Sequence, residues 1–310
     1  LDRIANLNTP PAARYSAVST SGDVGLIFYV EFPSVDPEAV FIGTATIADV
    51  EGEQRLKGIY KKQKGCYAFI VSMFPKYYDK KVTLTIVYNN ETYSFATSVE
   101  RYCNRLEELT GETSLEGKLG SSLLEYCGAA DGYFDDSIAD VEKKDLSAEE
   151  KAVLAGFAGS LTDAPNNDIE LKGANLTLES RTRINVYFKT EHDINDIVVS
   201  VKLNGKDVEK YTISKGEVDI DNDHVIDKNC YAIFLYNIVA KDLDNMYEIT
   251  IGTMQTVDGV TELVNDTVRY GALSYVNTVI TSGKATNKHY NMVVALYHYN
   301  ATANDYFAAK

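Results

Sequence analysis

The chain has no tryptophan and only four histidines and four cysteines in 310 residues. Four cysteines are too few for a disulfide scaffold, and no CxxC pair suggests a zinc site. Motifs of the GxSxG, HExxH, P-loop and GxGxxG types are also missing. Because the sequence has no catalytic signature, we expect a non-catalytic protein.

Long apolar runs and excess positive charge are missing as well. No run approaches the roughly 18 to 20 residues that a membrane-spanning helix needs. Lys and Arg number 30 against 45 Asp and Glu, a formal net charge of −15, which disfavours nucleic acid and anionic membranes as partners. The sequence begins at Leu1, which we interpret as a trimmed signal peptide or a start inside a longer gene.

One phrase occurs twice, as LLEYCGAADGYF at 123–134 and LYHYNATANDYF at 296–307. A constant offset, the one between Leu123 and Leu296, extends the match upstream. It pairs Tyr102 with Tyr275, Asn104 with Asn277, Tyr126 with Tyr299, Ala130 with Ala303, Tyr133 with Tyr306 and Phe134 with Phe307.

The match continues toward the N-terminus with a decreasing offset. CYAF at 66–69 matches CYAI at 230–233, and DVGLIFYV aligned with RINVYFKT pairs Phe28 with Phe188. The largest insertion, GTMQTVDGVTELVNDT in the second copy, is expected to be a longer hairpin loop, since loops accept added residues at low cost. We infer two tandem copies of one unit.

Each copy is predicted to place strands before helices. Copy one has five β-branched and aromatic runs, GLIFYVEF, AVFIGTATI, CYAFIVSMF, KVTLTIVY and TYSFATSV, and copy two repeats their order. Asn204-Gly205 predicts a tight hairpin. Apolar residues three and four apart then predict two helices, with LTGETS as the break between them.

The predicted fold is mainly β with α: two tandem antiparallel β-sandwich (Ig-like) domains, each closed by a C-terminal α-helical hairpin. The expected domains are 14–136 and 169–310. A partly helical linker is expected at 137–168, because Ser147 and Glu150 form a capping box there.

One acidic segment has the spacing of a cation site. Alternate carboxylates resemble the first half of a calcium loop, but position six is His224 rather than Gly, and position twelve is Cys230 rather than Glu. Calcium binding and a solvated acidic loop are therefore both open, and no other cofactor is predicted. The candidate ligands are Asp219, Asp221, Asp223 and Asp227.

The histidines are His192, His224, His289 and His298. The last two share a predicted helix, and their spacing places them on opposite faces, so they cannot bind one metal together. We expect them to be exposed.

The cysteines offer two interpretations. Cys103 and Cys127 lie on the two helices of one predicted hairpin, so a disulfide between them stays open, although copy two has Val and Asn there. Cys66 and Cys230 begin equivalent strands, and we interpret them as small buried hydrophobes.

The 22 tyrosines raise the question of sugar binding, because aromatic faces stack on pyranose rings. Tyrosines on helix stripes are more simply explained as core residues with the hydroxyl at the edge. Tyr77 and Tyr78, which we expect to be exposed on a strand, keep the carbohydrate hypothesis open.

Copy two contains, in this order, GANLTLESRTRINVYF, CYAIFLYNIVAKDLDNMYEITI, ALSYVNTVI and LYHYNATANDYF. Together these phrases resemble a poorly characterised repeat module of large secreted surface proteins from Gram-positive gut anaerobes. Copy one departs where PKYY replaces AKDL, so its match depends on the helices. The resemblance implies export and surface display and assigns no catalytic residue.

We therefore predict a non-catalytic extracellular or cell-surface repeat protein for adhesion, spacing or ligand binding, whose partner is a protein or glycan at the cell surface. Duplication favours this prediction because it doubles a binding face. The first alternative is a carbohydrate-binding module accessory to a polysaccharide-degrading enzyme. The second is a hydrolase that uses two carboxylates from the abundant acidic residues, such as Asp219 or Glu217.

Overall fold

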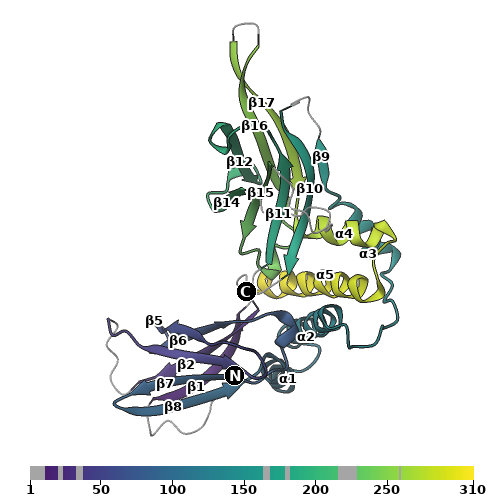
Figure 1. The fold of residues 1–310 in the computed structure, drawn as a ribbon. Coiled ribbons are helices and arrows are strands. Elements are labelled where there is room, and N and C mark those ends of the chain that lie inside the picture. Colours follow the sequence, from purple (N-terminus) through teal and green to yellow (C-terminus); the bar gives the residue numbers. More distant parts are fainter. Residues whose placement is uncertain are drawn as a thin grey trace. The chain divides into compact units, whose positions relative to one another are not determined.

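The computed structural model describes residues 11–19, 24–32, 38–162, 168–178, 182–215, 229–257 and 260–310 (Figure 1). The chain forms two compact units. The first comprises Leu1–Val141 together with Ala301–Lys310, and the second comprises Glu142–Asn300. The second unit thus begins inside the segment expected to be a linker, and the domain limits expected from the sequence stay a prediction.

Two antiparallel sheets form the first unit (Figure 1). The β1 sheet has the order β1-β2-β6-β5, with β1 Ala12–Ser19, β2 Gly25–Glu31, β6 Cys66–Ser72 and β5 Ile59–Lys61. The β3 sheet has the order β4-β3-β7-β8, with β4 Gln54–Lys57, β3 Ile42–Ile47, β7 Val82–Tyr88 and β8 Glu91–Thr97.

The two sheets of the first unit contact each other through apolar and polar side chains. Phe32, which follows β2, stacks on Phe41, which precedes β3, with ring centroids 3.8 Å apart. The side chain of Gln54 donates to the carbonyl of Ser72 at 2.6 Å and accepts from its N–H at 3.1 Å. On β7, Val82, Leu84 and Ile86 are buried in alternation, as expected for a strand with one face on a core.

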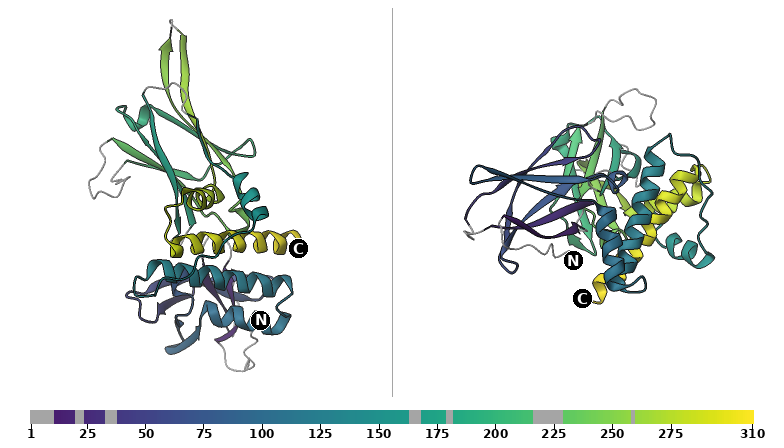
Figure 2. Two further views of the ribbon diagram at one scale, coloured as in Figure 1. Left: turned by 90° about the vertical axis from the view of Figure 1, so that its right-hand side faces the viewer. Right: turned by 90° about the horizontal axis from the view of Figure 1, so that it is seen from below.

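Helices follow the strands of the first unit, as the spacing predicted. They are the 3₁₀ helix η1 (Pro75–Tyr77), α1 (Val99–Thr110) and α2 (Leu115–Phe134), and α1 and α2 lie side by side (Figure 2). Ser98 and Ser114 cap α1 and α2 by accepting backbone N–H bonds. Gly111 ends α1 at a φ of 87°, a value that favours glycine.

The second unit repeats this arrangement. The β10 sheet has the order β10-β11-β15-β14, with β10 Glu170–Leu178, β11 Thr182–Lys189, β15 Cys230–Tyr236 and β14 Tyr211–Lys215. The β12 sheet has the order β13-β12-β16-β17-β9, with β13 Lys206–Asp207, β12 Ile197–Leu203, β16 Tyr247–Val257, β17 Val260–Tyr270 and β9 Ser160–Thr162.

The expectation of a longer hairpin loop in the second unit is wrong. The insertion expected to be a loop is instead strand, because β16 and β17 pair from Tyr247↔Tyr270 to Val257↔Val260. The neighbouring β12 pairs with β16 only as far as Thr253, so the end of the hairpin extends past it (Figure 1). The predicted hairpin at Asn204-Gly205 is confirmed, with both residues at positive φ.

The helical elements of the second unit are η2 (Ile194–Asp196), η3 (Ala240–Asp242), α3 (Ala148–Ala155), α4 (Ala272–Ser282) and the part of α5 (Asn287–Ala308) up to Asn300. The rest of α5, from Ala301 on, belongs to the first unit. The capping box predicted at Ser147 and Glu150 is present at the start of α3. The described residues include no helix that is both long and apolar enough to cross a membrane.

Strand register corrects the pairing of Phe28 with Phe188. Opposite Tyr67 in the first unit lies Val30, and opposite the matching Tyr231 in the second lies Phe188. Phe188 is therefore the counterpart of Val30. A two-residue shift keeps every side chain on the same face of a strand, so the apolar pattern could not reveal it.

Candidate functional site

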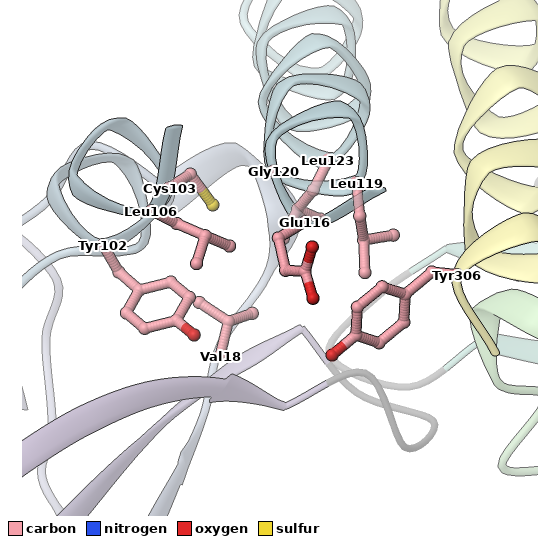
Figure 3. A pocket seen from close by; sticks show the side chains of 9 residues that line it. All are labelled: Val18, Tyr102, Cys103, Leu106, Glu116, Leu119, Gly120, Leu123 and Tyr306. Carbon is pink, nitrogen blue, oxygen red and sulfur yellow. The ribbon is translucent and has the colours of Figure 1, made fainter. Parts of the chain in front are cut away.

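The candidate site is a pocket of about 140 Å³ in the first unit (Figure 3). Its walls come from β1, α1, α2 and the segment Ala301–Lys310, which belongs to the same unit. The lining residues are Val18, Tyr102, Cys103, Leu106, Glu116, Leu119, Gly120, Leu123 and Tyr306.

Helix periodicity explains how these side chains converge. Tyr102, Cys103 and Leu106 lie three and four residues apart on one face of α1, and α2 presents Leu119 and Leu123 in the same way. The pocket wall is therefore mostly apolar.

Gly120 opens the space between the two helices. A Cβ atom built there would lie 3.6 Å from the Cβ atom of Cys103, which is ordinary van der Waals contact. The second copy has Val293 at the equivalent position, where it is fully buried, and Val276 where the first copy has Cys103. The glycine is thus a specific feature of the first half.

The polar atoms of the pocket form a cation site at its edge. The Lys310 ammonium donates to the Tyr306 hydroxyl at 2.6 Å and lies 4.3 Å from the centroid of the same ring. It also lies 3.4 Å from the carboxylate of Glu116, whose side chain is 34% exposed. These contacts, the Tyr306 hydrogen bond first, raise the pKa of Lys310. A positive charge is therefore stabilised beside the apolar wall.

The remaining titratable groups of the pocket favour their neutral forms. Burial raises the pKa of the Cys103 thiol to about 12, and burial also raises the pKa of the Tyr102 phenol. A thiol with so high a pKa is protonated near neutral pH and is a poor nucleophile. The Cys103 thiol is therefore poorly suited to act as a nucleophile.

The expectation that His289 and His298 are exposed is wrong. His289 and His298 are half-buried, and each has a partner: the Tyr275 hydroxyl lies 2.8 Å from His289 Nε2, and the Glu150 carboxylate lies 2.9 Å from His298 Nε2. Burial lowers the pKa of His289. Sequence spacing could not show these contacts, because both partners come from other helices.

His192 lies 3.4 Å from the Asp168 carboxylate, which also accepts a hydrogen bond from Gln255. Among the residues that the structure describes, no cluster of three or more His, Cys, Asp or Glu side chains could hold a metal ion.

The predicted calcium ligands Asp219, Asp221, Asp223 and Asp227 lie outside the described residues, as do His224 and the Glu217 of the hydrolase alternative. Calcium binding by this segment therefore stays a prediction.

All four cysteines are buried, and none of them forms a disulfide. Cys66 and Cys230 are 0% and 1% exposed, as expected for small core residues. The disulfide left open between Cys103 and Cys127 is not present in the structure, where both are thiols. Burial, followed by the nearby Cys103, raises the pKa of Cys127 well above its ordinary value.

Tyr77 and Tyr78 are not on a strand, contrary to expectation. Tyr77 ends η1, Tyr78 follows it, and both are half-buried. Tyr78 lies against α2, where a Cβ atom on Gly128 would be 3.6 Å from its hydroxyl.

Sequence reasoning missed the pocket. The available signal was Gly120 within the apolar face of a helix whose second copy has valine there.

Comparison with known proteins adds no identification: no protein-family model matches the chain, and no curated protein sequence matches it.

Proposed function

We propose that the chain is a non-catalytic extracellular or cell-surface protein, built from two tandem Ig-like β-sandwiches with helical hairpins, for adhesion, spacing or ligand binding. We also propose that the chain is related to the repeat module of Gram-positive surface proteins that its sequence resembles. The partner would be a protein or glycan at the cell surface.

Strand order supports the Ig-like part of the proposal. The orders β1-β2-β6-β5 and β4-β3-β7-β8 correspond to strands A-B-E-D and C′-C-F-G of an immunoglobulin sandwich. The second unit has the same two orders, with β9 added beside β17.

One observation supports duplication above the others, because it lies at the junction of helix and sheet. The N–H of Glu100 in α1 donates to the carbonyl of Tyr78 at 3.0 Å. At the equivalent place in the second unit, the N–H of Leu273 in α4 donates to the carbonyl of Leu243 at 3.2 Å. A scaffold built twice to this level of detail presents two related surfaces on one chain, which increases avidity for a repetitive partner.

Adhesion of the full chain tests this function. Beads coated with the chain should be retained on immobilised mucin or extracellular-matrix protein more than albumin-coated beads, and soluble chain should compete. Equal retention of the two kinds of bead, together with turnover of a glycoside or ester substrate by the pure chain, would contradict the proposal.

A carbohydrate-binding module is the second candidate, favoured by an exposed aromatic group around η1. Phe74 and Phe134 are 37% and 44% exposed, and the Lys76 ammonium lies 5.2 Å from the Tyr77 ring centroid and 5.7 Å from that of Phe134. Aromatic faces beside a hydrogen-bond donor suit a sugar ring. A glycan array should then give signals that Phe134→Ala removes, and a blank array would reject this candidate.

A further inference from the structure

We propose that the pocket between α1, α2 and β1 binds a primary ammonium group attached to a small apolar body, the chemistry of an arylalkylamine. This inference rests on the proposed binding function and names a ligand class for it. Three features of the molecule support it: the size of the pocket, the ammonium of Lys310 beside Glu116 and Tyr306, and the difference between the two halves of the chain.

The size and walls of the pocket suit one small apolar group. Its volume of about 140 Å³ is close to that of the engineered cavity of about 150 Å³ that takes up benzene in another protein. Val18, Leu106, Leu119 and Leu123 contribute apolar surface, so a phenyl-sized group would leave water on entering. Figure 3 shows these side chains around one space, with the Glu116 carboxylate and the Tyr306 hydroxyl directed into it.

The Lys310 side chain shows which head group fits at the edge. Its ammonium contacts a carboxylate, a hydroxyl and an aromatic ring face, which come from Glu116 and Tyr306. These are the groups that recognise a primary ammonium, whereas a ligand carboxylate would be repelled by Glu116. Lys310 thus occupies the position that a ligand cation would take, and it would compete with that ligand.

The other half of the chain provides a natural comparison. At the positions equivalent to Glu116 and Gly120 it has His289 and Val293. His289 is bonded to Tyr275, and Val293 is fully buried. The second half therefore lacks both the carboxylate and the glycine on which the proposal depends, and His289→Gln is a matched control.

Calorimetric titration of the full chain with 2-phenylethylamine at neutral pH tests the proposal. We expect saturable binding that is weaker for 2-phenylethanol, which lacks the charge, and weaker for ethylamine, which lacks the ring. The anion 3-phenylpropionate should not bind. A short acetylated peptide with one lysine is titrated in parallel, because the same chemistry could come from a protein side chain.

Four variants, of which His289→Gln is the control, should change the affinity for 2-phenylethylamine differently. Glu116→Gln should weaken 2-phenylethylamine binding about fivefold, the size typical of a partly exposed ion pair. Gly120→Val should abolish it by filling the pocket. Lys310→Met should strengthen it about twofold by removing the competing ammonium. His289→Gln should leave it unchanged.

Equal affinity for amine and alcohol would overturn the proposal, as would an unchanged affinity in Glu116→Gln. Absence of binding by the amine and the peptide, both to the parent chain and to Lys310→Met, would also overturn it. If Gly120→Val fails to fold, the affinities of Glu116→Gln and Lys310→Met for 2-phenylethylamine still test the proposal. The two proposals are tested separately: bead adhesion tests the wider function, and titration tests the amine site. If beads coated with Glu116→Gln adhere as well as beads coated with the parent chain, the wider function stands whatever the titration shows.

Discussion

The side chain of Asn300 in α5 donates a hydrogen bond from Nδ2 to the carbonyl oxygen of Ala240 in η3, at 2.7 Å. Both residues are buried, so water does not easily replace the bond. In the first half the residue equivalent to Asn300 is Cys127, which is also buried. The same helix position thus faces the interior with an amide in one half and a thiol in the other.

We expect Asn300→Ala to lower the free energy of unfolding by about 2 kcal/mol, because it leaves the Ala240 carbonyl buried without this donor. Urea denaturation followed by circular dichroism measures the loss. Asn277→Ala on α4 is the control and should change stability by less than about 0.5 kcal/mol. Equal effects of the two variants would contradict the importance of the bond.

Tyr126 and Tyr299 occupy equivalent positions on α2 and α5 and are 3% and 5% exposed. Replacing either by alanine should cost about 2 to 4 kcal/mol, because the ring leaves a cavity that the surroundings cannot fill completely. The melting temperature of each variant is the measurement. Phe134→Ala on the same helix as Tyr126 is the control, since Phe134 is 44% exposed. An unchanged melting temperature in Tyr126→Ala would show that the buried stripe contributes little.

Local sequence signals were sufficient for the paired helices and for two tight local features, whereas the five runs predicted as strands in the first copy did not include β1, β4 or β5. Ser147 with Glu150 predicted the start of α3, and Asn204-Gly205 predicted the hairpin, because these signals act over a few residues. Strand register could not be predicted from these signals. The sequence alignment paired Phe28 with Phe188, but Val30 lies opposite Tyr67 just as Phe188 lies opposite the equivalent Tyr231.

Contacts between distant segments could not be predicted in the same way. The pocket depends on Tyr306 meeting residues of α1 and α2, such as Tyr102 and Leu123, that lie far away in sequence. The insertion that forms the end of the β16–β17 hairpin was predicted to be a loop, because loops accept added residues at low cost. In the structure, cross-strand pairs such as Met254 opposite Leu263 extend the ladder instead.

The thiol of Cys103 lines the pocket, yet its pKa of about 12 predicts slow alkylation. In the folded chain, iodoacetamide at neutral pH should modify Cys103 and Cys127 far more slowly than it modifies a free cysteine. Unfolding in urea should restore the ordinary rate. Mass spectrometry of tryptic peptides measures both. Rapid labelling of Cys103 in the folded chain would mean that the thiol is more accessible and more acidic than its burial implies.

Burial lowers the pKa of His289, so the folded state favours the neutral imidazole. Above the ordinary histidine pKa of about 6.5, both folded and unfolded states hold it neutral, and its contribution to stability does not change. As the pH falls below that value the unfolded state takes up the proton first, so stability is lost toward acid. Urea midpoints at several pH values between about 5 and 8 measure this loss, and His289→Gln should reduce the slope. The same slope in the variant would assign the loss to other groups.

Gly43 lies on β3 where the two sheets of the first unit meet. A Cβ atom there would be 2.8 Å from Leu84 Cδ1 and 3.3 Å from Phe69 Cδ1, and both of those side chains are fully buried. We expect Gly43→Val to destabilise the first unit by about 1 to 3 kcal/mol, because the crowded side chains have no free space to enter. Calorimetric melting measures the change.

The second unit has Val199 at the place of Gly43, since Gly43 pairs with Ile86 and Val199 with the matching Ile251. Valine is therefore compatible with this strand position, and any loss in Gly43→Val comes from packing in the first unit rather than from strand propensity. Gly132→Ala on α2 is the control: its added Cβ atom would meet nothing within 4 Å, and the helix should gain up to about 1 kcal/mol. If Gly43→Val melts at the parent temperature, the two sheets are packed less closely at β3 than these distances indicate.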